Sequence, residues 1–155
     1  MDDHSWAQVK IGGRITQDQI TELERIADAN RYDQDEEAND GGFLTYSDSQ
    51  AKGALMGPLT EFCEKNELPY DHEWDPCVGY YNAGAVYYRP RTGSEKRTLD
   101  TTIEGEPVVP QREVARLLRS GKRIATPRKL GLLRDRLRHS AGLDVSKLQP
   151  IKIAG

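Results

Sequence analysis

Three residues near the middle of the chain have side chains that could bind a metal or act as a nucleophile. Cys63, His72 and Cys77 follow the pattern C-x8-H-x4-C, and acidic residues lie among them at positions 71, 73 and 75. Structural zinc sites use close pairs such as C-x2-C, which this sequence lacks. A catalytic cysteine needs a base and an oxyanion donor, and no donor can be named. We therefore predict no catalytic residue, no metal and no cofactor. An enzyme or metal protein centred on these residues is the least favoured of the three hypotheses developed below.

Two other stretches could bind ions. Residues 33–40 contain five carboxylates, but they lack the regular aspartate ladder and downstream glutamate of a calcium loop. We interpret them as a solvated acidic loop, or as a surface for a basic partner. Gly12-Gly13 separates a predicted strand from a predicted helix without the pattern of a P-loop or a GxGxxG loop, so a plain turn is expected there.

The elements that would position these residues are short strands and amphipathic helices. Trp6–Ile11 alternates apolar and polar residues, as in a half-buried strand. Thr16 and Gln19 fit a capping box that opens a helix. Apolar residues recur at helical spacing around Cys63, which indicates a second helix with this thiol in the core. The predicted strands are 6–11, 43–46, the two arms of 77–91, and 98–104, and the predicted helices are 16–30, 55–66 and 110–118.

The element order β-α-β-α-β-β-β-α predicts an α+β fold, with a mostly antiparallel sheet and helices on one face, followed by a basic helix and tail. A chain of 155 residues that is 36% hydrophobic and 30% charged can bury only a small core. We expect one α+β domain over residues 1–120 and the basic helix and tail over residues 121–155.

Two runs of β-branched and aromatic residues flank Asn82-Ala83-Gly84, and this pattern predicts a β-hairpin over residues 77–91. Tyrosine and arginine are enriched at recognition surfaces, so one face of the hairpin is a candidate binding surface. An ordinary solvent-facing sheet and a platform that stacks on bases remain alternatives. With Val78, Tyr80, Val86 and Tyr88 facing the helices, the predicted binding residues on the other face are Tyr81, Tyr87, Arg89 and Arg91.

A basic segment follows Ser120-Gly121. Thr126-Pro127 is a helix start signal, Gly142 is a stop, and leucines 130, 133 and 137 form a narrow apolar stripe. The segment could neutralise phosphates, place its leucines in a protein groove, or pack on its own domain with the arginines in solvent. Its candidate binding residues are Lys122, Arg123, Arg128, Lys129, Arg134, Arg136 and Arg138.

Charge is divided unequally along the chain. Residues 112–155 hold 12 of the 22 Lys and Arg but only 3 of the 25 Asp and Glu, which leaves 10 basic and 22 acidic residues before them. Such asymmetry bears on the choice of partners, although attraction between the two parts is an alternative. No apolar run is long enough for a membrane span. No export signal is recognisable either, so free thiols and a cytoplasmic location are expected.

Four short motifs lie between residues 9 and 118. They are Val9-Lys-Ile-Gly-Gly-Arg-Ile15, Leu59-x-x-Phe62-Cys63-Glu64 running into Leu68-Pro69-Tyr70-Asp71, Tyr88-Arg89-Pro90, and Gly105-Glu106-Pro107-Val108-Val109. Together they resemble a group of small uncharacterised α+β bacterial proteins carried on phages, plasmids and integrated elements. The likeness rests on turn and packing residues and does not reach the tail. It implies a protein that acts by binding, including as a blocker of host defence.

These observations favour a non-enzymatic interaction protein, a phage or mobile-element accessory factor that inhibits or modulates a host complex such as a CRISPR effector. The expected partner is a host protein or ribonucleoprotein complex, which the acidic and basic parts of the chain would contact. A nucleic-acid-binding protein that uses the basic C-terminal segment is the alternative.

Overall fold

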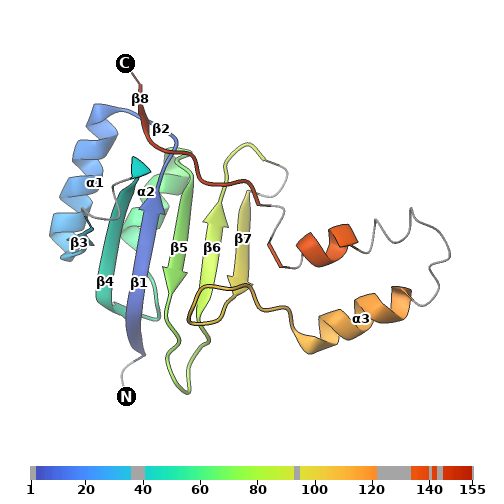
Figure 1. Cartoon of the computed structure of the whole chain (residues 1–155). Helices are drawn as coiled ribbons and strands as arrows, with labels where there is room; N and C mark the ends of the chain where they lie inside the picture. The colour runs from blue at the N-terminus through green and yellow to red at the C-terminus, as the bar shows by residue number, and fades with distance from the viewer. Residues whose placement is uncertain are drawn as a thin grey trace.

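The computed structural model describes residues 3–35, 41–92, 95–121, 134–139, 141–142 and 145–154. It contains a six-stranded antiparallel sheet in the spatial order β3-β4-β1-β5-β6-β7, so the predicted α+β fold is confirmed (Figure 1). Its strands are β1 (His4–Ile11), β3 (Asp33–Gln34), β4 (Leu44–Lys52), β5 (Tyr70–Trp74), β6 (Gly84–Tyr88) and β7 (Lys96–Asp100). The helices are α1 (Gln17–Asn30), α2 (Gly57–Lys65) and α3 (Gln111–Gly121), and β2 (Arg14–Ile15) pairs in parallel with β8 (Lys152–Ile153).

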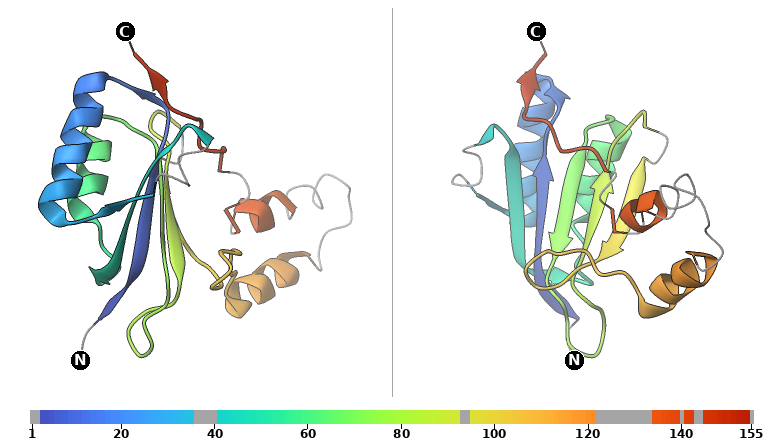
Figure 2. Two further views of the ribbon diagram at one scale, coloured as in Figure 1. Left: turned by 60° about the vertical axis from the view of Figure 1, so that its left-hand side comes forward. Right: turned by 45° about the vertical axis from the view of Figure 1, so that its right-hand side comes forward.

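Strand β1 lies between two antiparallel neighbours, β4 and β5. Its alternating apolar residues Ala7, Val9 and Ile11 are fully buried, as the sequence pattern predicted. They share one core with Leu23 of α1 and Leu59 of α2. Both helices cover the same face of the sheet (Figure 2), and we call the opposite face the open face. Within the described residues, no helix is both long and apolar enough to cross a membrane.

Local signals place the two core helices. The predicted capping box of α1 is confirmed, because the Thr16 hydroxyl accepts from the Gln19 amide and the Gln19 side chain accepts from the Thr16 amide. Helix α2 carries Pro58 in its first turn, where the missing N–H costs no helical hydrogen bond. The helix therefore begins at Gly57, and Cys63 is fully buried against the sheet, as predicted.

The predicted hairpin over residues 77–91 is wrong in its first arm. Cys77 and Tyr81 close a tight turn, in which the Tyr80 and Tyr81 amides donate to the Cys77 carbonyl and Gly79 has a φ of +85°. Strand β6 pairs instead with β5, so the hairpin consists of residues 70–74 and 84–88. The sequence pattern missed β5 because three consecutive polar residues, 71–73, hide the apolar positions on its core side.

The basic C-terminal part is only partly described. Helix α3 extends away from the sheet beyond β7 (Figure 1), and residues 134–139 are helical, within the predicted basic helix. The short helix rests on β7, because the Arg97 guanidinium donates to the ring Nδ1 and the carbonyl of His139. A Cβ on Gly142 would overlap the side chain of Leu99, so this turn also packs closely on β7. Residues 122–133 lie outside the described residues.

The last described residues, 145–154, cross one end of the sheet. The Gly13 amide donates to the Gln149 carbonyl at 2.9 Å, and the Gly13 carbonyl accepts from the Lys152 amide at 2.9 Å. A Cβ on Gly12 would overlap the Gln149 carbonyl oxygen. The diglycine therefore does more than turn the chain after β1. Because it has no side chains, the backbone of the tail can lie directly against it.

Replacing Gly12 with alanine is expected to destabilise the fold by about 1–3 kcal/mol, because the methyl group would displace the tail from the sheet. Gly57→Ala is the matched control, since its Cβ would meet nothing closer than 3.7 Å. Urea unfolding measures both free energies. Equal stabilities for the two variants would show that the tail does not lie against Gly12.

Candidate functional site

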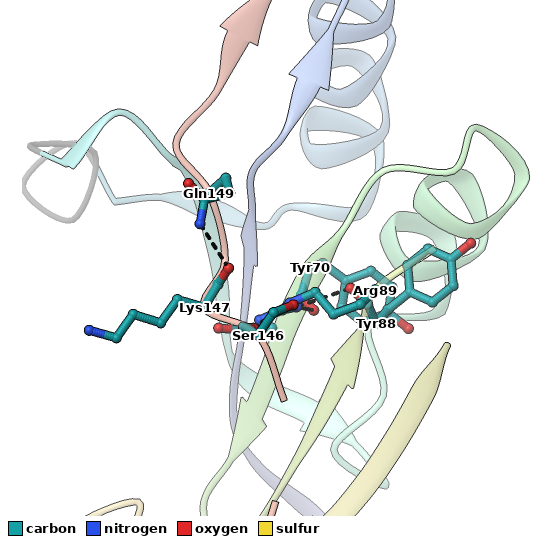
Figure 3. A network of polar contacts seen from close by, with 7 residues as sticks. Tyr70, Tyr88, Arg89, Ser146, Lys147 and Gln149 are labelled. Carbon is teal, nitrogen blue, oxygen red and sulfur yellow. Dashed lines mark hydrogen bonds and ion pairs between the residues drawn. The ribbon is translucent and has the colours of Figure 1, made fainter. Parts of the chain in front are cut away.

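The Arg89 guanidinium is buried, with only 7% of the residue exposed, so the prediction that Arg89 lies on an exposed binding face is wrong. Its Nη2 pairs with Asp71 Oδ1 at 2.7 Å, and its Nη1 donates to the Tyr70 and Tyr88 carbonyls at 3.0 Å each. Its Nε donates to the Ser146 carbonyl at 2.9 Å, which joins the tail to the sheet (Figure 3). Arg89 therefore has a structural role.

The partner of this arginine belongs to an acidic pair on the open face of β5. Asp71 pairs with Lys10 of β1 in the sheet register, and Glu73 lies two residues further along the same face. Burial raises the pKa of Asp71, and Arg89 and Lys10 oppose this shift. Burial and the neighbouring Asp71 raise the pKa of Glu73 as well. The half-buried Asp71 and the exposed Glu73 are thus acidic neighbours on the open face.

The other residues of the predicted hairpin surface do not form one face. The Tyr81 hydroxyl bonds with Ser5 Oγ at 2.9 Å and donates to the Asp3 carbonyl at 3.1 Å, so it fastens a loop to β1. Tyr87 is half-buried on the open face, where burial, Glu73 and Asp71 raise its pKa. The Arg91 side chain is 79% exposed and pairs with Glu67 at 2.6 Å.

The predicted basic residues divide between described and undescribed parts. Arg134, Arg136 and Arg138 are exposed on the short helix of residues 134–139, and Arg134 lies 3.8 Å from the carboxylate of the adjacent Asp135. The remaining four candidates, Lys122, Arg123, Arg128 and Lys129, lie outside the described residues.

Exposed apolar side chains gather at one end of the sheet. The strand pairs His4–Lys52, Trp74–Gly84 and Gly84–Asp100 bring together the start of β1 and the loops of residues 53–56, 75–83 and 101–110. Seven large apolar residues are exposed among those described, and six lie at this end. We call these six the apolar loop end: Trp6 (36%), Leu55 (70%), Val78 (95%), Tyr80 (50%), Ile103 (71%) and Val108 (42%).

The turns of this end explain why its apolar residues are exposed. Gly79 and Gly105 take φ values of +85° and +81°, and a Cβ at either position would meet nothing within 4 Å. Val78 and Ile103 therefore project from open turns, although Val78 and Tyr80 were predicted to face the helices. A cleft of about 40 Å³ opens between Trp6, Trp74 and the loop of residues 101–105. In the sequence, the signal for this surface is the position of single apolar residues close to turn glycines, Val78 before Gly79 and Ile103 before Gly105.

The three residues of the C-x8-H-x4-C pattern lie in different environments. Cys63 is in the core, where burial raises the pKa of its thiol, and Cys77 begins the tight turn of the 75–83 loop. His72 lies on the core side of β5. Neither cysteine forms a disulfide, and no group of three or more potential metal ligands occurs within the part of the chain that is described.

Arg89→Met is expected to destabilise the protein by about 3–5 kcal/mol, because it leaves the Asp71 carboxylate buried without its charge partner. Arg91→Met is the control, since it breaks an exposed ion pair and should cost less than about 1 kcal/mol. Urea unfolding gives both values, and hydrogen exchange should show loss of protection around residue 146 in the first variant alone. A similar cost for the two variants would contradict the structural role of Arg89.

Comparison of this chain with known proteins identifies no relative. No protein-family model, no curated protein and no solved structure matches the chain.

Proposed function

We propose that this chain is a non-enzymatic interaction protein that binds a host protein or ribonucleoprotein complex through the apolar loop end. The single observation that carries this proposal is the gathering of six exposed apolar residues at one end of the sheet. Exposed aromatic and aliphatic groups that lie together are typical of a surface that a protein partner covers. The opposite end of the sheet is crossed by the chain's own tail.

The charge distribution supports a macromolecular partner. The acidic part of the chain precedes residue 112, and the basic part follows it. Opposite charges on different parts of one protein steer a partner into one orientation and raise the rate of association. A ribonucleoprotein offers both basic protein surface and phosphate, so it could contact both parts.

The biological context of the proposal comes from the resemblance of residues 9–118 to accessory proteins of phages and other mobile elements. We propose that the protein acts in the host cytoplasm and blocks or modulates a defence complex, in the manner of an anti-CRISPR protein. This part of the proposal rests on analogy.

The double variant V78D/I103D tests the apolar loop end. Immobilised wild-type protein should retain a partner from host lysate at moderate salt, and the variant should retain at least tenfold less. Two buried anchor residues typically contribute more than 1 kcal/mol each, which is enough for such a loss.

Ile153→Asp is the matched control, because Ile153 is the exposed apolar residue at the other end, with 63% exposure. It should leave retention unchanged. Recovery of no protein by the wild type, or equal recovery by V78D/I103D, would count against the proposal.

Nucleic-acid binding by the basic segment is the second candidate function. Arg134, Arg136 and Arg138 are exposed within five residues, and Arg112 and Arg119 of α3 are exposed as well. Grouped arginines neutralise phosphates and release counterions, which makes affinity depend steeply on salt.

The triple variant R134Q/R136Q/R138Q should weaken retention of DNA or RNA in a gel-shift assay and should lower the salt slope by up to about 2–3. The charge-matched control is R14Q/R25Q/R91Q, which removes three exposed arginines from the α+β body. No retention by the wild type at low salt, or an equal loss in both variants, would exclude this function.

A further inference from the structure

The cleft of about 40 Å³ at the apolar loop end has a lining of unusual chemistry. Trp6 of β1 and Glu73 of β5 line one side, and the loop of residues 101–105 lines the other. Strand β6 lies between these two sides, and its Ala85, with a short side chain, lines the floor. Trp6 and Glu73 alternate with residues of the core side, so the cleft belongs to the open face of the sheet.

Two carboxylates, those of Glu73 and Asp75, line this cleft together. They are two residues apart in extended chain, so their side chains leave the same face. The Asp75 amide donates to the Trp6 carbonyl at 3.0 Å, which places Trp6 directly opposite Asp75 and diagonally opposite Glu73. Side chains in these cross-strand positions are within reach of one another. One ligand group could therefore contact the indole and both carboxylates.

The negative charge of this cleft has little compensation. None of the described residues that line it is basic, and neither Glu73 nor Asp75 forms an ion pair or a side-chain hydrogen bond within the described part of the chain. Asp71, by contrast, pairs with Arg89. Burial and Asp71 raise the pKa of Glu73, and Lys10 opposes this shift. A cation that entered the cleft would stabilise both carboxylates.

We propose that this cleft binds an arginine side chain of the protein partner, with its guanidinium against the carboxylates of Glu73 and Asp75. A guanidinium donates to carboxylates in a planar fork and also stacks on aromatic faces, so it suits a site that combines two carboxylates with the Trp6 indole. Ile103 and the indole offer apolar contact to the alkyl stem.

The size of the cleft agrees with one side-chain head. A volume of this kind holds about three water molecules, which is comparable to the four heavy atoms of a guanidinium. Trp6 and Ile103 belong to the apolar loop end, so the inference rests on the proposed function. It adds that the surface of the partner presents an arginine beside its apolar contacts.

The test compares the capped tripeptide Gly-Arg-Gly with Gly-citrulline-Gly, in which a neutral urea of nearly the same shape replaces the guanidinium. Titration of the full-length, isotope-labelled protein at low salt, followed by amide NMR shifts, should place the arginine peptide at residues 73–75, 84–85 and 101–105. We expect it to bind about threefold or more tightly than the citrulline peptide, the effect of an accessible ion pair. Gly-Lys-Gly should also bind less tightly, because an ammonium neither stacks nor donates in a fork. Equal affinity of the arginine peptide and either of the others, or shifts elsewhere on the protein, would overturn the proposal.

Variants separate the cleft from the general charge of this end. E73Q/D75N removes both charges and keeps the shape, so it should abolish the preference for arginine over citrulline. The matched control is E104Q/E106Q, which removes two exposed carboxylates from the same end but outside the lining, and it should keep the preference. An equal loss in both variants would exclude the cleft. Trp6→Leu should weaken the arginine peptide about threefold, and unchanged binding by this variant would overturn the proposal even if E73Q/D75N failed to fold.

Retention of the partner from host lysate distinguishes this inference from the proposed function. Immobilised E73Q/D75N should retain about threefold less partner than the wild type. Equal retention by E73Q/D75N, together with loss in V78D/I103D, would overturn the arginine inference and leave the proposed function intact. Binding of the arginine peptide in the cleft without recovery of any partner would count against the proposed function and would support the preference of the cleft for arginine.

Discussion

The position of the C-terminal tail depends on the buried guanidinium of Arg89. This one group donates to carbonyls of β5 and β6, pairs with Asp71, and donates to the Ser146 carbonyl of the tail. Removing an arginine from water costs several kcal/mol unless its donors find acceptors in good geometry. The tail supplies one of those acceptors, so the sheet and the tail satisfy each other, and neither arrangement is complete alone.

The two ends of the sheet consequently differ. At one end the tail crosses Gly12 and Gly13, and its strand β8 pairs in parallel with β2. At the other end, the described loops project Val78 and Ile103 from open turns. The chain's own tail thus covers one end of the sheet, and apolar side chains are exposed at the other. This asymmetry underlies the proposal of a partner at the apolar loop end.

Polar groups are handled differently on the two faces. On the open face, Asp71 and Glu73 are neighbours on β5, and Lys10 pairs with Asp71 in the register of β1. On the helix-covered face, Glu64 accepts a hydrogen bond from Tyr70 and pairs with Lys96. His72 Nε2, by contrast, has no hydrogen-bond partner among the described residues. Buried polar atoms without partners are uncommon in folded proteins.

Local sequence determined the elements whose signals are short in range. Alternation in β1, the capping box of α1, Pro58 in the first turn of α2 and the burial of Cys63 all follow from neighbours in the chain, and so does the α+β class. Only the tertiary structure decided the pairing of β5 with β6. The charged residues of β5 obscure its apolar pattern, whereas residues 77–81 resembled a strand although Gly79 turns the chain there. The tertiary structure also decided the role of Arg89, whose partners lie 18 and 57 residues away in Asp71 and Ser146. Contacts of that range leave no periodic trace in the sequence, and neither does the gathering of apolar loops at one end of a sheet.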